Sequence, residues 1–199
     1  MNSIEEGLIV SGTGHRLDKL GGYASWAYNL LVQLAVMILS ALKPKKVISG
    51  MAIGWDQALA EAAVRLGIPF IAAIPFKGQE SRCPKESQKK YHELLAQAAE
   101  VVDTSNGQSY HPRLMQVHND GMGDNIDLAD ALFDGTKSGT YNCVKYAKRE
   151  GARIKNYYLG ILPVLTGGDS YCGSAPWGGF ASVGSHFTEW PYCASLSMG

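Results

Sequence analysis

Charge is scarce in this sequence. Asp, Glu, Lys and Arg make up 18% of the 199 residues, below the roughly 25% usual for soluble domains, and the formal net charge is zero. Proteins that bind nucleic acid or acidic membranes through their overall electric field carry a strongly basic surplus. The composition has no such surplus, so we expect no nucleic-acid partner.

Charge is missing altogether from residues 21–42, a stretch long enough to span a bilayer. Polar side chains interrupt it at Ser25, Asn29, Gln33 and Ser40, and a cluster of lysines follows it. We therefore predict a buried helix rather than a membrane span, and we expect no membrane partner.

Paired cysteines are also missing. Cys83, Cys143, Cys172 and Cys193 form no CxxC motif of the kind that indicates a zinc site, and we expect free thiols. The N-terminus is acidic where a secretory leader would be basic. These features predict a cytoplasmic protein with no metal and no cofactor.

What the sequence does contain is a regular alternation of two apolar patterns. Short apolar runs predict strands at residues 8–10, 45–50, 69–76, 101–102 and 128–135. Longer amphipathic or alanine-rich stretches predict helices at 24–42, 55–67, 85–100, from 115, and at 140–151. Such alternation is typical of an α/β, Rossmann-like open parallel sheet with helices on both faces.

The C-terminal residues differ in composition. We predict a ligand-binding domain over residues 1–156 and an extension over 157–199. The extension is rich in glycine and aromatic residues and has no Lys or Arg; its charges are Asp169 and Glu189. We assign it no function.

Glycine-rich stretches follow three of the predicted strands: "SGTGHR" (11–16), "SGMAIGWD" (49–56) and "DGTKSGTYN" (134–142). Glycines let backbone amides approach an anion closely. The carboxyl ends of parallel strands meet at one edge of the sheet, where ligands bind. The first stretch is neither a GxGxxG nor a Walker motif, but together the three stretches predict one anion site.

Side chains in and near these loops can add donors to the site. Arg16 can bind a phosphate in bidentate fashion, and Thr13 and His15 can donate hydrogen bonds. The predicted ligand-binding residues are Gly12, Thr13, Gly14, His15, Arg16, Gly50, Met51, Gly54, Trp55, Asp56, Phe76, Gln79, Asn119, Asp134, Gly135, Thr136, Gly139 and Thr140.

Three of these residues have two interpretations. Trp55 either covers a base or ribose or belongs to the core. Asp56 either faces the ligand or caps the helix that begins there. Asp134 either accepts ribose hydroxyls or caps its turn. The sequence leaves these alternatives open.

The ordered set "GTGHR", "ISGMAIGWDQALAEAAVRLG" and "DGTKSGTYNCVKYA" resembles the SLOG superfamily, which is related to the LOG phosphoribohydrolases and to DprA. The likeness covers about residues 8–155 and is greatest to the YpsA-like branch. It implies a Rossmann-like domain that binds a nucleotide-derived ligand of the ADP-ribose type, and a homo-oligomer. Some members of the superfamily cleave an N-glycosidic bond, whereas others only bind a ligand.

One departure from the pattern bears on activity. LOG enzymes place a glutamate in the helix after the glycine-threonine loop, where it assists cleavage of the ribosyl bond. Residues 141–145 here read "YNCVK", and no carboxylate occurs before Glu150. We therefore expect binding without turnover, for sensing or for sequestration of a signal, as by a phage protein acting on a host immune signal.

The alternative is an N-glycosidase or phosphoribohydrolase acting on a nucleoside monophosphate or an NAD-like substrate. It needs a carboxylate that stabilises the oxocarbenium-like state or activates water. The candidates are Asp56, Glu80 and Asp134.

Overall fold

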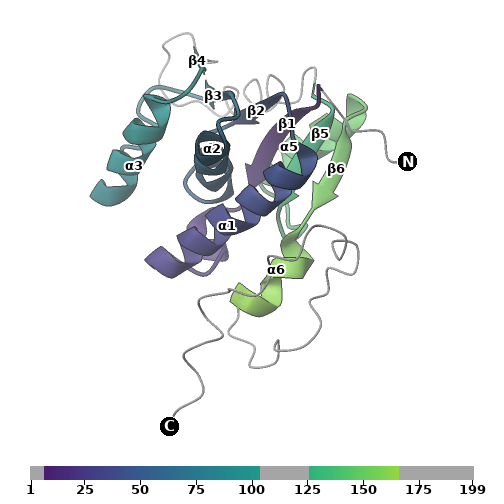
Figure 1. The fold of residues 1–199 in the computed structure, drawn as a ribbon. Coiled ribbons are helices and arrows are strands. Elements are labelled where there is room, and N and C mark those ends of the chain that lie inside the picture. The colour runs from purple at the N-terminus through teal and green to yellow at the C-terminus, as the bar shows by residue number, and fades with distance from the viewer. Residues whose placement is uncertain (1–6, 104–125, 166–199) are drawn as a thin grey trace, which may run out of the picture. The chain divides into compact units, whose positions relative to one another are not determined.

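The computed structural model describes residues 7–103 and 126–165 (Figure 1). The chain divides into two compact units, Met1–Leu159 and Gly160–Gly199, and the first unit holds the whole sheet. Most of the predicted extension lies outside the described residues, as do the helix predicted from residue 115 and Asn119.

Six parallel strands form one sheet in the order β4-β3-β2-β1-β5-β6, which confirms the predicted α/β fold (Figure 1). The strands are β1 (Ile9–Gly14), β2 (Lys46–Ser49), β3 (Phe70–Ile74), β4 (Glu100–Asp103), β5 (Leu128–Leu132) and β6 (Arg153–Asn156). The helices are α1 (Ser25–Leu42), α2 (Trp55–Leu66), α3 (Lys85–Leu95), α5 (Gly139–Arg149) and α6 (Tyr158–Leu165), with a 3₁₀ turn at Leu17–Lys19.

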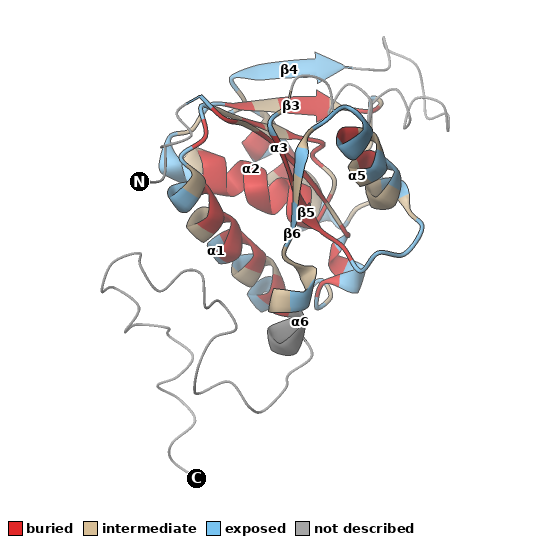
Figure 2. Cartoon of the chain, turned by 90° about the vertical axis from the view of Figure 1, so that its right-hand side faces the viewer, coloured by how far each residue is buried: buried red, intermediate tan, exposed pale blue. Residues whose placement is uncertain are grey.

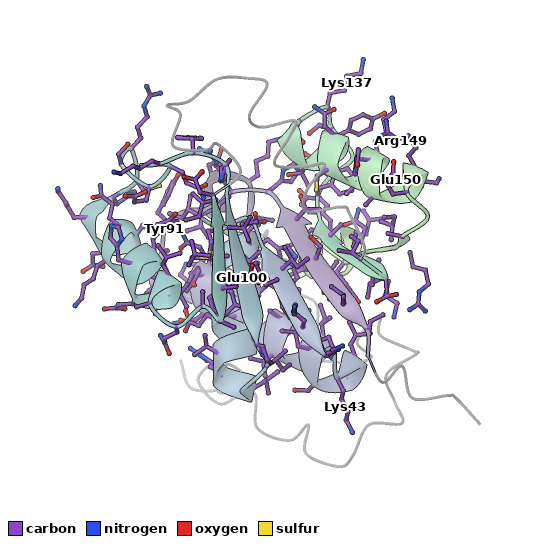
Figure 3. The ribbon with its side chains drawn as sticks, turned by 90° about the horizontal axis from the view of Figure 1, so that it is seen from above. Lys43, Tyr91, Glu100, Lys137, Arg149 and Glu150 are labelled. Atoms are coloured by element: carbon purple, nitrogen blue, oxygen red, sulfur yellow. The ribbon has the colours of Figure 1, made fainter. Side chains whose placement is uncertain are left out.

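Helices cover both faces of the sheet, as predicted. The helix α2 packs on β1, β2 and β3, and both α1 and α3 pack against α2. On the other side α5 packs on β1, β5 and β6. Figure 3 shows α3, with Tyr91, and α5, with Arg149 and Glu150, on either side of the strands.

Several predicted boundaries were wrong. The helix predicted over residues 85–100 ends at Leu95, because the next residues turn back and the amide of Ala99 donates to the carbonyl of Phe70 (2.9 Å), which leads into β4. The strand predicted at residues 128–135 ends at Leu132. The strand β6 was not predicted, because its sequence, RIKN, is mostly polar and lies at the sheet edge.

The helix α1 forms most of the uncharged segment at residues 21–42. In the described part of the chain it is the one helix long and apolar enough to cross a membrane. Its buried residues recur at the three- and four-residue spacing of a helix packed on a core. They are Ala27, Leu31, Val32, Leu34, Ala35, Ile38 and Leu39.

A nearly buried carboxylate connects α1, α2 and α3. Glu61 of α2 accepts hydrogen bonds from the hydroxyl of Tyr28 in α1 (2.9 Å) and from Arg65 (2.6 Å). The ammonium of Lys90 in α3 lies 3.2 Å away. Burial alone would raise the pKa of Glu61, but these donors outweigh it and hold the pKa below its usual value. The three helices are thus joined by an ionised side chain that is only 11% exposed.

We expect Glu61→Gln to lower the free energy of unfolding at neutral pH by about 1.5–3 kcal/mol, the range for hydrogen bonds to charged groups. An unfolded glutamate ionises near pH ~4.3. Because the folded-state pKa of Glu61 is lower, its stabilisation is present above that pH and is lost as the pH falls through the folded-state value. Urea denaturation of both proteins from neutral to acidic pH measures the difference.

Glu93→Gln is the matched control. Glu93 is 49% exposed and lies 3.8 Å from Lys89 on the same helix, so we expect a change below about 0.5 kcal/mol. Equal losses in the two variants would contradict the assigned role of Glu61.

Candidate functional site

The order in which strands are added to the sheet reverses at β1. From β1 the chain adds β2, β3 and β4 on one side, then returns to add β5 and β6 on the other. In open parallel sheets ligands bind in the crevice beyond the carboxyl ends of the strands at this switch point. Here the residues at that position are His15 and Arg16 after β1, and Phe133 to Thr136 after β5.

The first glycine stretch is not a loop. β1 runs through "SGTG" to Gly14, whereas the sequence predicted that the strand ended at Val10. A Cβ at Gly12 would collide with Leu59, and one at Gly14 would collide with Trp55, both residues of α2. The two glycines therefore allow α2 to lie close against β1. The prediction that Gly12, Thr13 and Gly14 lie in a loop was wrong, because they belong to the strand, while their contact with a ligand stays a prediction.

Gly14, in the first of the three predicted loops, forms hydrogen bonds with a residue of each of the other two. Its amide donates to the carboxylate of Asp56 in the first turn of α2 (3.1 Å). Its carbonyl accepts from the hydroxyl of Thr140 in the first turn of α5 (3.0 Å). Since α2 and α5 cover opposite faces of the sheet, their N-terminal ends meet at the last residue of β1.

The second loop is held against the chain that leaves β1. Gly54 has φ +123°, and a Cβ there would lie 2.5 Å from the carbonyl oxygen of His15, so only glycine fits. The amide of Trp55 donates to that oxygen (3.4 Å), and the amide of Gln57 donates to the carbonyl of Ala52 (3.3 Å). The first turn of α2 thus has protein acceptors of its own and offers few free amides to a ligand.

The rest of the second loop is buried. Met51 is fully buried with φ +59°, and its amide donates to the hydroxyl of Ser49 (3.1 Å). The carbonyl of Gly50 accepts from the side chain of Gln79 (3.0 Å), which ties the loop after β3 to this one. Phe76 is half-buried in that same loop.

Trp55 belongs to the core. Its ring is fully buried against Gly14, and its indole nitrogen donates to the carbonyl of Asp130 (3.3 Å). Of its two interpretations the structure therefore supports the core residue, and the indole is not placed to cover a base.

His15 and Asp134 lie in contact just beyond the carboxyl ends of β1 and β5. The imidazole Nε2 of His15 lies 2.8 Å from the Asp134 carboxylate and 3.0 Å from the Asp134 amide nitrogen. His15 is buried and makes edge-to-face contacts with Phe133 and Tyr158. The two strand ends are therefore connected by a contact between side chains.

One oxygen of the Asp134 carboxylate has several hydrogen-bond partners. The hydroxyl (2.6 Å) and the amide (2.8 Å) of Thr136 donate to it, and together with His15 they hold its pKa well below the usual value. Lys19, which the sequence did not single out, lies 3.4 Å from the same carboxylate. Asp134 thus caps its turn, and the structure supports this interpretation over a ribose contact.

The pKa of Asp56 lies well above the usual value for an aspartate. Burial raises its pKa to about 7, and the hydrogen bond from Gly14 and the nearby charge of Arg16 only partly oppose this. The other two candidate carboxylates are committed elsewhere. Glu80 lies 3.5 Å from His92 of α3, and Asp134 is engaged by Thr136 and His15. A pKa near 7 allows Asp56 to exchange a proton near neutral pH.

The surface best suited to an anion combines Arg16 with the start of α5. The side chain of Arg16 is exposed and forms no hydrogen bond or ion pair with another described residue. Gly135, Thr136 and Gly139 of the third loop are exposed or half-buried. The amides of the first turn of α5 have no acceptor within the helix and carry the positive end of its dipole.

The N-cap of α5 is Ser138, whose hydroxyl accepts from the amide of Tyr141 (3.2 Å). Ser138 was not among the predicted site residues. Its signal was present in the sequence, because a serine just before a helix is a typical N-cap.

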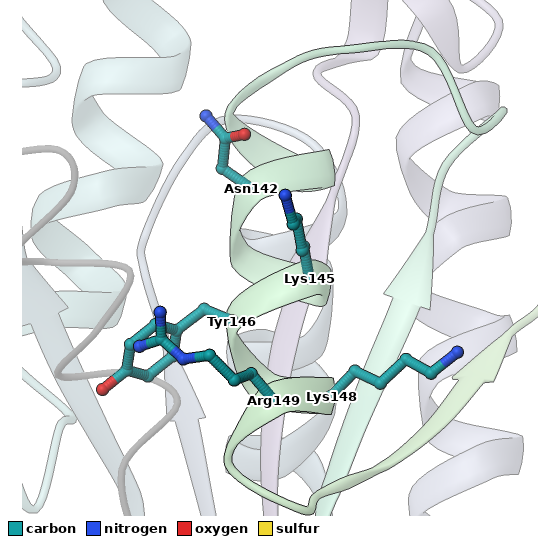
Figure 4. Close-up of a pocket in the computed structure, with 5 residues that line it drawn as sticks. All are labelled: Asn142, Lys145, Tyr146, Lys148 and Arg149. Atoms are coloured by element: carbon teal, nitrogen blue, oxygen red, sulfur yellow. The ribbon is translucent and has the colours of Figure 1, made fainter.

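A separate hollow of about 490 Å³ lies over α5 (Figure 4). It is lined by Asn142, Lys145, Tyr146, Lys148 and Arg149, and the guanidinium of Arg149 lies 4.6 Å from the centre of the Tyr146 ring. It includes none of the predicted site residues. In the described residues there is also no group of three or more side chains that could hold a metal ion.

A sequence model of the DNA recombination-mediator protein A family matches residues 27–157. The chain belongs to this family. A relative from Bacillus subtilis (strain 168), the uncharacterized SPbeta prophage-derived protein YoqJ, is 32% identical over 117 residues, covering 51% of this chain and 68% of the relative. These matches confirm the assignment to the SLOG superfamily, while the YpsA-like branch stays a prediction.

Two solved structures of DNA processing protein A share the fold. The Streptococcus pneumoniae protein is 16% identical, with a TM-score of 0.50, and the match covers 75% of this chain and 50% of that one. The Helicobacter pylori protein, whose structure concerns single-stranded DNA binding, is also 16% identical, with a TM-score of 0.51 and coverage of 75% and 64%. This chain therefore spans half to less than two thirds of those chains.

We expect Gly14→Ala to lower the free energy of unfolding by about 1–3 kcal/mol, because the added methyl group overpacks the contact between β1 and Trp55. Gly139→Ala is the matched control, since nothing lies within 4 Å of a Cβ there and alanine is a better helix former. Thermal unfolding of both variants tests this, and a Gly14→Ala protein as stable as wild type would contradict it.

Asp130 is a buried carboxyl that has no hydrogen-bond partner among the described residues. It lies in β5, is fully buried, and neither of its carboxylate oxygens has a hydrogen-bond partner in the described part of the chain. Burial raises its pKa well above the usual value, and the charge of Lys155 on the neighbouring strand opposes this only partly. Folding at neutral pH therefore requires Asp130 to be protonated or to be buried as an unpaired charge.

We expect Asp130→Asn to raise the free energy of unfolding at neutral pH by about 1–3 kcal/mol. Below the unfolded pKa of about 3.9 both states hold the proton and the cost vanishes. As the pH rises towards the raised folded-state pKa, the wild type loses stability that the variant keeps. Urea denaturation at acidic and neutral pH measures this, and a variant that is less stable at neutral pH would refute it.

Proposed function

We propose that the protein binds a phosphate-bearing nucleotide derivative at the carboxyl edge of the sheet, between β1 and β5, and holds it without cleaving it. The observation that carries this proposal is the hydrogen bond from Thr140 to Gly14 (3.0 Å). It sets the N-terminus of α5 beside the end of β1, two residues before the exposed Arg16. A helix N-terminus suits a phosphate, and so does a guanidinium that has no hydrogen-bond or ion-pair partner among the described residues.

The ligand class follows from the family and from the charges at the edge. The SLOG relationship favours ADP-ribose or a cyclic relative as the ligand, and the phosphates of such a molecule would meet Arg16 and the first turn of α5. The carboxylate of Asp134 is occupied by Thr136 and His15, so the ribose hydroxyls would be recognised by other groups.

The absence of turnover rests on the carboxylates near the site. Residues 141–145 of α5 supply none, and Glu80 and Asp134 are engaged by His92 and by Thr136 with His15. A binder of this kind would sense a signal or sequester it. The prophage origin of the Bacillus subtilis relative supports sequestration of a host signal by a phage protein.

One observation favours the second candidate, an N-glycosidase or phosphoribohydrolase. Asp56 has a pKa of about 7, which suits a general acid or base at neutral pH. Its carboxylate already accepts from the amide of Gly14, however, and the residue is buried. Activity would therefore require Asp56 to reach a bound substrate from beneath the site.

Arg16→Ala should weaken the binding of ADP-ribose by about 1.5–3 kcal/mol, which is roughly 10- to 150-fold, because a charge-assisted pair with phosphate is lost. Isothermal titration calorimetry measures the affinity. Arg149→Ala is the matched control, since it also removes an exposed arginine but lies at the far end of α5, paired with Glu150. Equal affinity of the Arg16→Ala variant and wild type would count against the site.

Mass spectrometry separates the two candidate functions. A nucleotide derivative that is released from the purified protein, and recovered unchanged after incubation with fresh protein, supports binding. Free base that accumulates with time, and stops accumulating in Asp56→Asn, supports the hydrolase. Salt-dependent binding of single-stranded DNA instead would contradict the expectation of no nucleic-acid partner.

A further inference from the structure

The strand β6 forms one edge of the sheet. Among the described residues its neighbouring strand is β5 alone. The amides of Arg153 and Tyr157 both donate to carbonyls in or next to β5, at 3.0 Å each. Backbone groups alternate in direction along a strand, so the amide and the carbonyl of Ile154 point away from β5. Neither of them forms a hydrogen bond in the described part of the chain.

The segment around this edge is strongly basic. Residues 135–156 contain six of the chain's 18 Lys and Arg but one of its 18 Asp and Glu. Since the whole chain is neutral, the rest of it is acidic. An anionic partner is therefore attracted to this part of the surface. The six cations are all exposed: Lys137, Lys145, Lys148, Arg149, Arg153 and Lys155.

Two of these cations lie on the face of the sheet that α2 covers. A Cβ at Gly12 would collide with α2, so Gly12 faces that helix. Asp130 is in register with Gly12, and Lys155 is in register with Asp130. Because paired residues share a face and side chains alternate along a strand, Lys155 and Arg153 lie on the α2 face of β6.

Other cations belong to α5, which packs on the opposite face of β6 and precedes it in the chain. Lys148 and Arg149 point to opposite sides of α5 (Figure 4). The one carboxylate of the segment, Glu150, lies 2.9 Å from Arg149, whereas Lys148 forms no ion pair with another described residue. Figure 2 looks towards the β6 edge and shows exposed residues along β6 and on the outer side of α5.

We propose that β6 accepts an extended acidic segment of another protein as a further strand of the sheet. The outward amide and carbonyl of Ile154 pair with the backbone of that segment, which is the mode of β-strand addition. Side chains of the added strand alternate between the two faces. Carboxylates on one face meet Arg153 and Lys155, and those on the other face meet the cations of α5.

The cations decide which strand can pair with this edge. Lys and Arg on an edge strand oppose the addition of a neutral or basic strand, whereas opposite charges on neighbouring strands stabilise their pairing. The other edge of the sheet has the reverse character, since β4 reads EVVD and carries Glu100 and Asp103. An acidic segment is therefore repelled at β4 and attracted at β6.

A nucleic acid matches the β6 edge less completely. Its phosphates can pair with the cations, but a phosphodiester has no donor for the outward carbonyl of Ile154. A lipid surface would need a larger apolar area, because Ile154 is the one apolar residue of β6 and is already half-buried. A polypeptide backbone supplies both a donor and an acceptor at the spacing of a strand.

The test is the binding of a labelled eight-residue peptide of alternating Glu and Thr to the full chain, measured by fluorescence anisotropy. Wild type should bind it, and added salt should weaken the binding. Arg153→Glu should raise the dissociation constant at least about tenfold, because like charges then face each other across neighbouring strands. Lys89→Glu makes the same change of charge on α3, where Lys89 is 79% exposed, and should leave the binding unchanged. Circular dichroism verifies that both variants are folded.

Two further measurements separate strand addition from simple attraction between charges. The same peptide with N-methylated amides keeps its carboxylates but loses its backbone donors, and should bind at least about tenfold more weakly. Ile154→Pro removes one outward amide while the bonds to β5 remain, and should weaken binding roughly two- to tenfold, the effect of one hydrogen bond.

Three outcomes would overturn the proposal. They are a wild type that does not bind the acidic peptide, equal binding of the N-methylated peptide, and tighter binding of a single-stranded thymidylate octamer than of the peptide. Equal losses in Arg153→Glu and Lys89→Glu would also contradict it, because the binding would then follow net charge and not the edge. None of these measurements involves a nucleotide ligand of the ADP-ribose type, so they are independent of the function proposed above.

Discussion

The close approach of α2 to β1 is the constraint on which the rest of this structure depends. Gly12 and Gly14 have no side chains, so Leu59 and Trp55 of α2 can rest directly on the strand. Gly54 then lets the loop before α2 lie against the backbone of His15. Larger residues at these positions would push the helix off the sheet and separate the two strand ends from the loops that meet them.

That packing determines which groups remain for a ligand. The polar groups nearest Gly14 form hydrogen bonds within the protein. Asp56 binds the Gly14 amide and holds α2, Thr140 binds the Gly14 carbonyl and holds α5, and Asp134 binds Thr136 in the turn after β5. Among the described residues, Arg16 forms no side-chain hydrogen bond or ion pair, and the first turn of α5 has amides without an acceptor inside the helix. The proposed retention of a phosphate without cleavage of a glycosidic bond rests on this distribution of groups.

The outer helices also differ in the charge that they expose. The helices α3 and α5 carry charged outer faces, whereas the outer face of α1 has none. Internal charges are balanced where they occur, as at Glu61, which has three donors from three helices. The exception is Asp130, which is buried without a partner in the described residues.

The sequence by itself determined the class of fold and the order of its elements, because apolar periodicity and glycine stops such as Gly67 are local signals. It also predicted Arg16 and the glycine-threonine loop as parts of the ligand site. It could not determine what the glycines do. Whether Gly14 cradles a phosphate or accepts an indole depends on α2, which begins 41 residues later. The same holds for Asp134, whose cap includes His15, 119 residues earlier in the chain. Only the tertiary structure decides such roles, because they arise from contacts between distant segments.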